Sequence, residues 1–305
     1  MRIAALALAA AATSAAQSAA EHTGFTFYER LDGTHNQLGL FTRLDSTVGY
    51  NFNTHFGIDA GLPVYFVRPS DSASGTLGMS SVNGIGNAHF TGRLSFPNPS
   101  LDYVTSFTVT APTGSESKGL STGHVTYDWN NHFDHTFGRL MPYADVGLAN
   151  EISDTPFFVR PFISHGFVAH LEGGALVRIV NHLSLGGSGY AIEPSGEQTI
   201  ISRINDSSPA PATTTPTPAT PAPSQGMGQG QGRGMGQGRT PGVFEVVHKT
   251  VGTADIARDR GASAWVMVTP SPTVDFEIGY SRSTTYRLDT VFFGIGFNLA
   301  SWIRR

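Results

Sequence analysis

Alternation of apolar and polar residues is the feature that most constrains how this chain can fold. Residues 38–52 read "LGLFTRLDSTVGYNF", which places Leu40, Leu44 and Val48 on one face of an extended strand and polar residues on the other. Residues 55–67, 163–180, 273–283 and 286–299 repeat the pattern. A period of two predicts β-strands with one apolar and one polar face, and it fits a soluble sandwich as well as a membrane barrel.

The lengths of the connections favour the barrel. Connections after even-numbered strands are mostly tight, whereas those after odd-numbered strands include several long loops, so the long loops gather at one end. This arrangement predicts an all-β, transmembrane, antiparallel up-and-down β-barrel of about 12 strands with both termini at the short-turn end. The predicted strands are 24–33, 38–52, 55–67, 85–96, 102–112, 121–131, 139–149, 163–180, 183–193, 255–269, 273–283 and 286–299.

The N-terminus indicates an exported protein. Arg2 precedes an Ala-rich apolar run, and small residues lead to the charged Glu21. We predict a signal peptide at residues 1–20 with cleavage near Ala20, and a mature barrel at residues 21–305. We therefore expect an outer-membrane location, with outer-membrane lipid and the barrel-assembly machinery as partners.

Composition excludes several functions. Charged residues make up 14% of the chain, the formal net charge is −4, and cysteine is absent. No basic surface argues for nucleic acid as a partner, and thiol catalysis and cysteine-ligated metals are excluded. We expect no cofactor.

A low-complexity insert separates the last three predicted strands from the others. It contains "TTTPTPATPAPSQGMGQGQGRGMGQGRTPG" from Thr213 to Gly242. Three strands cannot close a barrel by themselves, so the insert is not a linker between domains. We predict one long extracellular loop at residues 194–250, including a disordered low-complexity segment at 209–242.

Polar residues on the inner face of the predicted strands are candidates to line a lumen. They are Arg43, Asp45, Asp59, His124, Asp128, Asp145, His170, Glu172, Arg178, Asp275 and Glu277. These side chains either surround a narrow channel for small solutes or satisfy one another inside a filled barrel.

Two other functions stay open at this point. A structural or surface-interaction barrel would work through its long loop. A lipid hydrolase is suggested by the spacing of His182 and Ser184, but this pair falls in a predicted short turn. Asp134 with His132 and His135 could contact a metal, although imidazoles in a polar turn are more often solvated. We expect a protein that is not an enzyme, with no catalytic residues and no metal.

One hairpin resembles a known family. Residues 108–129, "TVTAPTGSESKGLSTGHVTYDW", carry a Pro-Thr-Gly strand end at Pro112 to Gly114 and a Gly-rich re-entry from Gly119 to Gly123. In this the chain resembles outer-membrane barrels of the phenol-degradation meta-pathway family. The resemblance implies a channel or transporter for small molecules, with hydrophobic or aromatic ones among the candidates, and it implies no catalytic or ligand residues.

Overall fold

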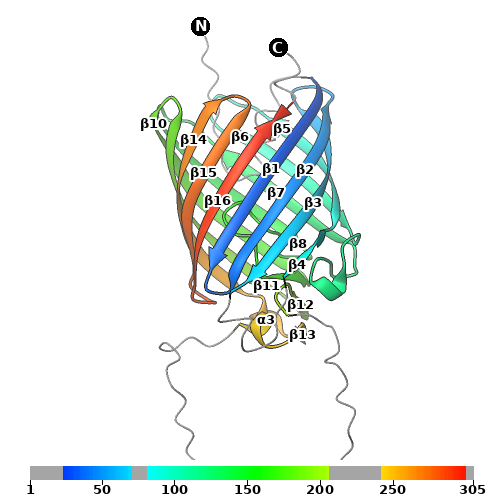
Figure 1. Cartoon of the computed structure of the whole chain (residues 1–305). Helices are drawn as coiled ribbons and strands as arrows, with labels where there is room; N and C mark the ends of the chain where they lie inside the picture. Colours follow the sequence, from blue (N-terminus) through cyan, green and yellow to red (C-terminus); the bar gives the residue numbers. More distant parts are fainter. Residues whose placement is uncertain (1–22, 71–80, 206–241, 300–305) are drawn as a thin grey trace, which may run out of the picture.

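The computed structural model describes residues 23–70, 81–205 and 242–299, and these form a closed antiparallel β-barrel of 12 strands (Figure 1). Each strand pairs with its neighbours, and β1 closes the ring by pairing with β16 as well as β2. The short strand β4 (Val82–Ile85) pairs with the end of β3. The barrel strands are β1 (Gly24–Asn36), β2 (Gly39–Asn51), β3 (Phe56–Pro69), β5 (Ala88–Phe96), β6 (Asp102–Ala111), β7 (Thr126–Asp134), β8 (Leu140–Ala149), β10 (Val168–Val180), β11 (Leu183–Pro194), β14 (Asp259–Ser271), β15 (Val274–Ser283) and β16 (Leu288–Asn298).

The predicted fold class is confirmed, and the boundaries that were wrong have a local cause. The strand predicted at 121–131 begins only at Thr126, because Gly119 and Gly123 adopt left-handed backbone with φ of 66° and 75°. The strand predicted at 163–180 is two strands, β9 (Phe162–His165) and β10, separated by Gly166 with φ of 147°. Period-two alternation continues through such glycines, so it could not locate these breaks.

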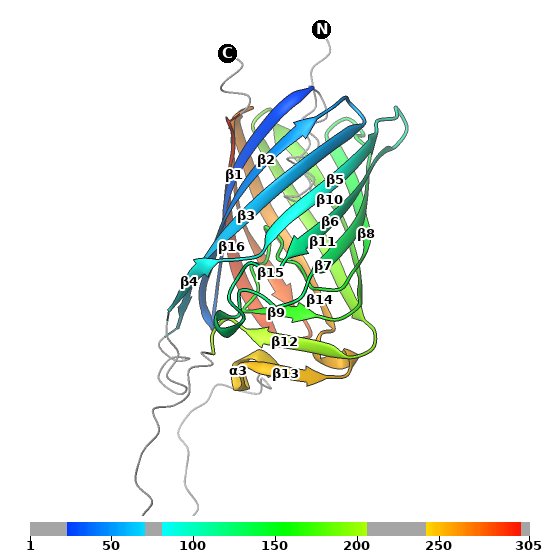
Figure 2. The same cartoon turned by 90° about the vertical axis from the view of Figure 1, so that its right-hand side faces the viewer.

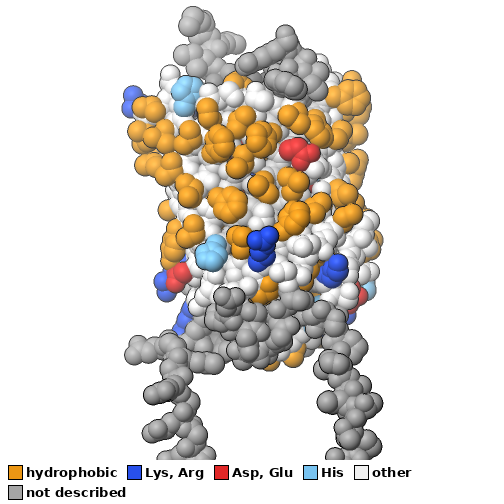
Figure 3. Space-filling view, in the orientation of Figure 1, with side chains coloured by type: hydrophobic (Ala, Val, Ile, Leu, Met, Phe, Trp, Pro, Cys, Tyr) orange, Lys and Arg blue, Asp and Glu red, His pale blue; other side chains and the backbone are white. Residues whose placement is uncertain are grey.

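The outer wall of the barrel is apolar. Exposed side chains on strands around the barrel include Phe66, Phe107, Trp129 and Ile278, and Figure 3 shows apolar side chains spread over the wall, with most charged ones toward the long-loop end. In water this surface would be unfavourable, whereas it matches the hydrocarbon band around a transmembrane barrel.

An aromatic girdle marks the short-turn end of the outer wall. Rings of Phe25, Tyr50, Phe52 and Phe56 follow one another with centroid separations of 5.0 to 5.1 Å. A second run joins Phe96, Tyr103 and Phe133 at 5.7 and 4.9 Å. Aromatic residues favour the boundary between hydrocarbon and headgroups, so the girdle defines one edge of the membrane-spanning band.

The two ends of the barrel differ as the sequence predicted. The beginning of β1 and the end of β16 lie together at the end with short turns (Figure 1). At the other end a small sheet of β9, β12 (Gln198–Ser202) and β13 (Lys249–Gly252) crosses the barrel mouth beside the short helix α3 (Val243–Val246) and the 3₁₀ turns η1 (Glu116–Lys118) and η2 (Ala254–Ile256) (Figure 2). None of the helices in the described parts of the chain has the length and apolarity to cross a membrane.

A hydrophobic cluster fills the mouth at the long-loop end. Phe162, Ile200 and Phe244 come from the connections and are almost fully buried against Phe41 and Leu288 of the barrel wall. The Phe162 and Phe244 rings stack with centroids 5.0 Å apart. The connections are thus packed onto the barrel as part of the same core.

Two sequence predictions fall outside this description. The predicted signal peptide at residues 1–20 and most of the low-complexity segment 209–242 lie outside the described residues. Ser202, which precedes that segment, donates a hydrogen bond at 2.7 Å to the carbonyl oxygen of Phe244, which follows it. The two chain segments that flank it are therefore joined at the barrel mouth.

The lipid-facing wall can be tested with a charge. Ile278 lies midway along β15 and is 59% exposed, so Ile278→Arg should destabilise the barrel in phospholipid vesicles by about 2 to 4 kcal/mol. Val251→Arg is the matched control, because Val251 is 54% exposed but belongs to the sheet at the mouth. Urea unfolding in vesicles measures both. Equal effects of the two substitutions would contradict a membrane-spanning wall at β15.

Candidate functional site

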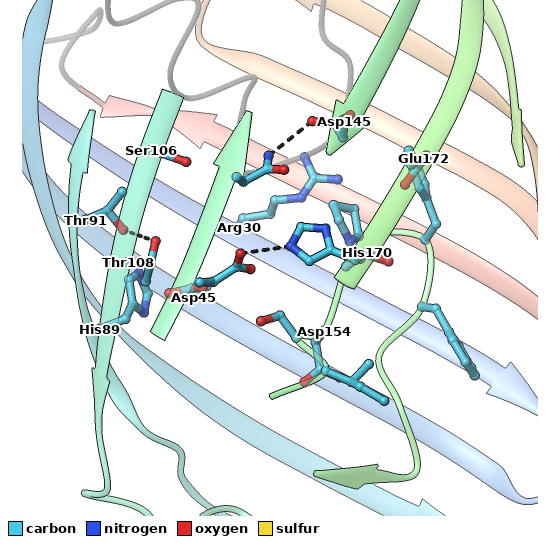
Figure 4. A pocket seen from close by; sticks show the side chains of 18 of the residues that line it. Arg30, Asp45, His89, Thr91, Ser106, Thr108, Asp145, Asp154, His170 and Glu172 are labelled. Atoms are coloured by element: carbon cyan, nitrogen blue, oxygen red, sulfur yellow. Dashed lines mark hydrogen bonds and ion pairs between the residues drawn. The ribbon is translucent and has the colours of Figure 1, made fainter. Parts of the chain in front are cut away.

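The candidate site is a cavity inside the barrel with a volume of about 360 Å³. Its wall is built from residues of eleven of the barrel strands, together with a loop at residues 151–160 that connects β8 to β9. Figure 4 shows its polar side chains converging from several strands. Arg30, Asp45, His89, Ser106 and His170 are among them.

The loop at 151–160 folds into the lumen and narrows it. Phe157 is buried, and its ring lies 4.4 Å from the Trp265 ring and 5.3 Å from the Phe292 ring, measured between centroids. Trp265 in turn lies against Gly186, where an added Cβ would meet the indole at 2.1 Å. A glycine at this position of β11 therefore makes room for the ring that receives the loop.

Asp154 holds the loop in place. Its carboxylate accepts hydrogen bonds from Arg203 at 2.9 Å, from the Tyr65 hydroxyl at 2.8 Å and from the Arg160 backbone N–H at 2.8 Å. The Arg203 guanidinium also lies over the Tyr65 ring, 4.4 Å from its centroid. Burial by itself would raise the pKa of Asp154, but Arg203 and Arg43 lower it below the usual value, so the carboxyl is ionised.

Ion pairs organise the wall formed by β1, β2, β3, β5 and β15. Arg30 contacts Asp32 at 2.7 Å and Asp275 at 3.2 Å, and it also pairs with Glu277. The other pairs in this wall are Arg43 with Asp32 at 2.8 Å and Arg93 with Asp59 at 3.1 Å. Arg43 and Arg93 are neutralised from the adjacent strand, and Arg30 reaches across β16 to the carboxylates of β15, so these ion pairs link the strands of the wall.

Carboxylates and imidazoles share the opposite wall, formed by β7, β8 and β10. His170 Nε2 lies 2.9 Å from Asp128, and the buried His132 Nδ1 lies 2.9 Å from Asp145. The Tyr143 hydroxyl donates a hydrogen bond to Glu172 at 2.9 Å. No arginine or lysine forms an ion pair with these three carboxylates among the described residues.

The predicted lumen residues fall into three groups. The cavity is lined by Arg43, Asp45, Asp59, Asp128, Asp145, His170 and Glu172. Asp275 and Glu277 face inward onto Arg30. His124 and Arg178 lie elsewhere: His124 is exposed in the loop before β7, where its ring stacks on His165, and Arg178 lies near the short-turn end of β10.

Sequence reasoning missed other residues of the site. Arg30 and Arg93 lie at inward positions of β1 and β5, and the same alternation could have found them. Asp154, Phe157 and Arg203 lie in connections, where no periodicity shows which side chains enter the lumen.

The residues of the two weaker hypotheses have structural partners. His182 lies in the turn between β10 and β11, and its Nδ1 lies 3.0 Å from the Thr269 carbonyl oxygen. His132 is buried between Asp134 and Asp145. Within residues 23–70, 81–205 and 242–299, no group of three or more metal-ligating side chains is arranged to hold a metal ion.

A smaller cavity of about 140 Å³ lies toward the long-loop end. Glu151 to Asp154 line both cavities, so this part of the loop separates them. Burial and the nearby Asp128 and Asp154 raise the pKa of Glu151 to about 7. The partition between the cavities therefore contains a carboxyl group that titrates near neutral pH.

The fold and the site define a transmembrane β-barrel with a constricted, charged lumen, and one solved structure with a TM-score above 0.5 shares this fold. The crystal structure of an outer membrane channel from Pseudomonas putida F1 matches with a TM-score of 0.53 and 12% identity, over 91% of this chain and 96% of that one. The KdgM porin in complex with disordered oligogalacturonate has a TM-score of 0.46 and 8% identity, over 89% and 98% of the two chains. The NanC porin has a TM-score of 0.45 and 7% identity, over 89% and 98%. No family model matches the sequence, and no curated protein does.

The loop anchor can be tested by a pair of arginine substitutions. Arg203→Ala leaves the buried Asp154 without its guanidinium and should lower the free energy of unfolding by about 3 kcal/mol. Arg282→Ala removes an equivalent contact to Asp289, in which both side chains are more than half exposed, and should cost less than about 1 kcal/mol. Urea midpoints of the refolded barrels give the comparison. A small effect for both would show that Asp154 does not anchor the loop.

Glu151 predicts a pH dependence with a definite sign. Because its pKa in the folded barrel, about 7, exceeds the ordinary value of 4.5, the folded state binds an extra proton between these values. Stability from this group is therefore lost as pH rises from 5 to 8. Glu151→Gln should gain stability relative to the unsubstituted protein over that interval, measured by urea unfolding at both pH values. A difference that stays constant with pH would refute the assignment.

Proposed function

We propose that this protein is an outer-membrane channel that passes small solutes through its lumen. The observation that carries the proposal is the cavity of about 360 Å³ inside a closed barrel, lined by charged side chains and narrowed by an inward-folded loop. Volumes of about 300 to 1,000 Å³ are typical of sites that hold small molecules. The predicted signal peptide and the apolar outer wall support the outer membrane as the location.

The charged lumen is better suited to solute passage than to a solid core. Seven carboxylates and four arginines line the cavity, and a filled barrel interior would leave such groups costly to bury unless every one were paired. Arg30, Arg43 and Arg93 meet this requirement on one wall, whereas the β7, β8 and β10 wall retains carboxylates beside open space. Water and solute are the natural partners for these groups.

The apolar part of the lining extends the proposal to the solute. Ile152, Phe157, Phe158, Val168 and Ile192 face the cavity beside the polar wall. A solute with an apolar or aromatic portion would contact both surfaces. The resemblance of residues 108–129 to the phenol-degradation meta-pathway family supports the same class of solute.

The structural or surface-interaction barrel is the second candidate function. The observation in its favour is the apolar cluster around Phe162 and Phe244, which packs across the long-loop mouth. A barrel closed there would carry no current, so a conductance measurement separates the two functions.

Phe157 provides the test of the channel. Purified protein in planar bilayers should give steady single-channel steps, and Phe157→Ala should increase the conductance, because it removes the ring that anchors the loop between Trp265 and Phe292. Phe137→Ala is the matched control, since Phe137 is 61% exposed in the turn between β7 and β8 and should leave the conductance unchanged. If neither the unsubstituted protein nor Phe157→Ala gives any conductance although both are folded, the channel is rejected in favour of the structural barrel.

A further inference from the structure

Two carboxylates face each other across neighbouring strands in the lumen wall. The register of β8 and β10 pairs Asp145 directly with Glu172, and both side chains line the cavity. Figure 4 shows them on adjacent strands. Like charges at directly opposite positions of a sheet are destabilising, so this arrangement carries a cost that the other wall, with its guanidinium pairs, avoids.

The groups around this pair do not neutralise it. Asp128 and Asp134 bring the carboxylates of the β7, β8 and β10 wall to four, and the cations that face it are His132, His170 and Arg160. Even with both imidazoles protonated, three positive charges face four negative ones. The wall around Asp145 and Glu172 therefore carries a net negative charge.

Asp145 also retains an unused acceptor. Asp145 is 7% exposed. Its Oδ1 atom accepts hydrogen bonds from His132 and Asn130, but its Oδ2 atom has no hydrogen-bond partner among the described residues. The Asn130 Oδ1 atom beside it is also unsatisfied. Buried acceptors without donors are costly, so a positive charge in the cavity beside Asp145 would offset part of the cost of its carboxylate.

The surroundings fit an organic cation better than a metal ion. The cavity of about 360 Å³ is far larger than one ion requires, and apolar side chains such as Ile152, Val168 and Ile192 lie within the same lining. No arrangement of three or more metal-ligating groups occurs in the described part of the chain. An ammonium group supplies several N–H donors and one positive charge, and its carbon skeleton would contact the apolar lining.

We propose that the lumen contains a binding subsite for small organic ammonium ions, in which Asp145 and Glu172 bind the charged nitrogen and Ile152, Val168 and Ile192 contact the apolar body. The subsite deepens the proposed channel function, because it lies on the path that a solute would take. It makes the β7, β8 and β10 wall the selective side of the lumen, with preference for cations over neutral and anionic molecules of the same shape.

Equilibrium binding tests the subsite without requiring conduction. Isothermal titration calorimetry of the detergent-solubilised barrel at pH 7 would use benzylammonium, with benzyl alcohol and phenylacetate as neutral and anionic matches. We expect benzylammonium to bind at least about tenfold more tightly than either match. Asp145→Asn/Glu172→Gln should abolish that preference, whereas Asp289→Asn/Glu193→Gln, which changes two carboxylates outside the cavity lining, should retain it.

The outcomes distinguish this proposal from the channel itself. Equal binding of benzylammonium and benzyl alcohol by the unsubstituted barrel overturns the subsite, and that measurement needs no variant to fold. Displacement of benzylammonium by calcium chloride but not by sodium chloride of equal ionic strength would assign the carboxylates to a divalent cation and also overturn it. Selective binding of benzylammonium without any conductance in planar bilayers would support the subsite and reject only the channel.

Discussion

The pairing of β1 with β16 is the constraint on which the rest of the structure depends. A sheet surrounded by hydrocarbon cannot leave a row of backbone N–H and C=O groups unpaired, because each costs several kcal/mol. The antiparallel register from Tyr28 with Asn298 to His35 with Val291 removes the last edge. Closure then creates an inner surface separated from lipid, and only there can Arg30, Asp275 and Glu277 come together from the two ends of the sequence.

The closed wall has two unlike sides. On one side, Arg30, Arg43 and Arg93 each form ion pairs with carboxylates of the same or nearby strands, which neutralises these guanidinium groups. On the other, carboxylates share two imidazoles and leave acceptors unused. The loop at 151–160 lies between the two, with Asp154 bound by Tyr65 of β3 and by Arg203 from the connection after β12. The loop therefore narrows the lumen at the same depth at which the charged groups of the two walls face each other.

The sequence predicted the barrel well and the lumen in part, for physical reasons. Alternation reports which face of a strand a residue occupies, so it placed Asp45, Asp128 and Glu172 on the inner wall. It failed for His124, because glycines with left-handed backbone end the regular pattern before β7 begins. It also could not foresee Asp154 or Phe157, whose positions depend on contacts with distant strands. The position of a side chain that enters the cavity from a connection is set by contacts within the closed barrel, and no local sequence pattern reveals it.

The contacts around the loop at 151–160 also depend on the register in which the barrel closes. Asp154 is separated from its partners Tyr65 and Arg203 by 89 and 49 residues, and Phe157 rests on Trp265 and Phe292 from the last part of the chain. These groups surround the loop together only in the closed barrel, where strands from both ends of the chain are adjacent. A barrel that closed in a different register would not bring Tyr65, Trp265 and Phe292 around the loop.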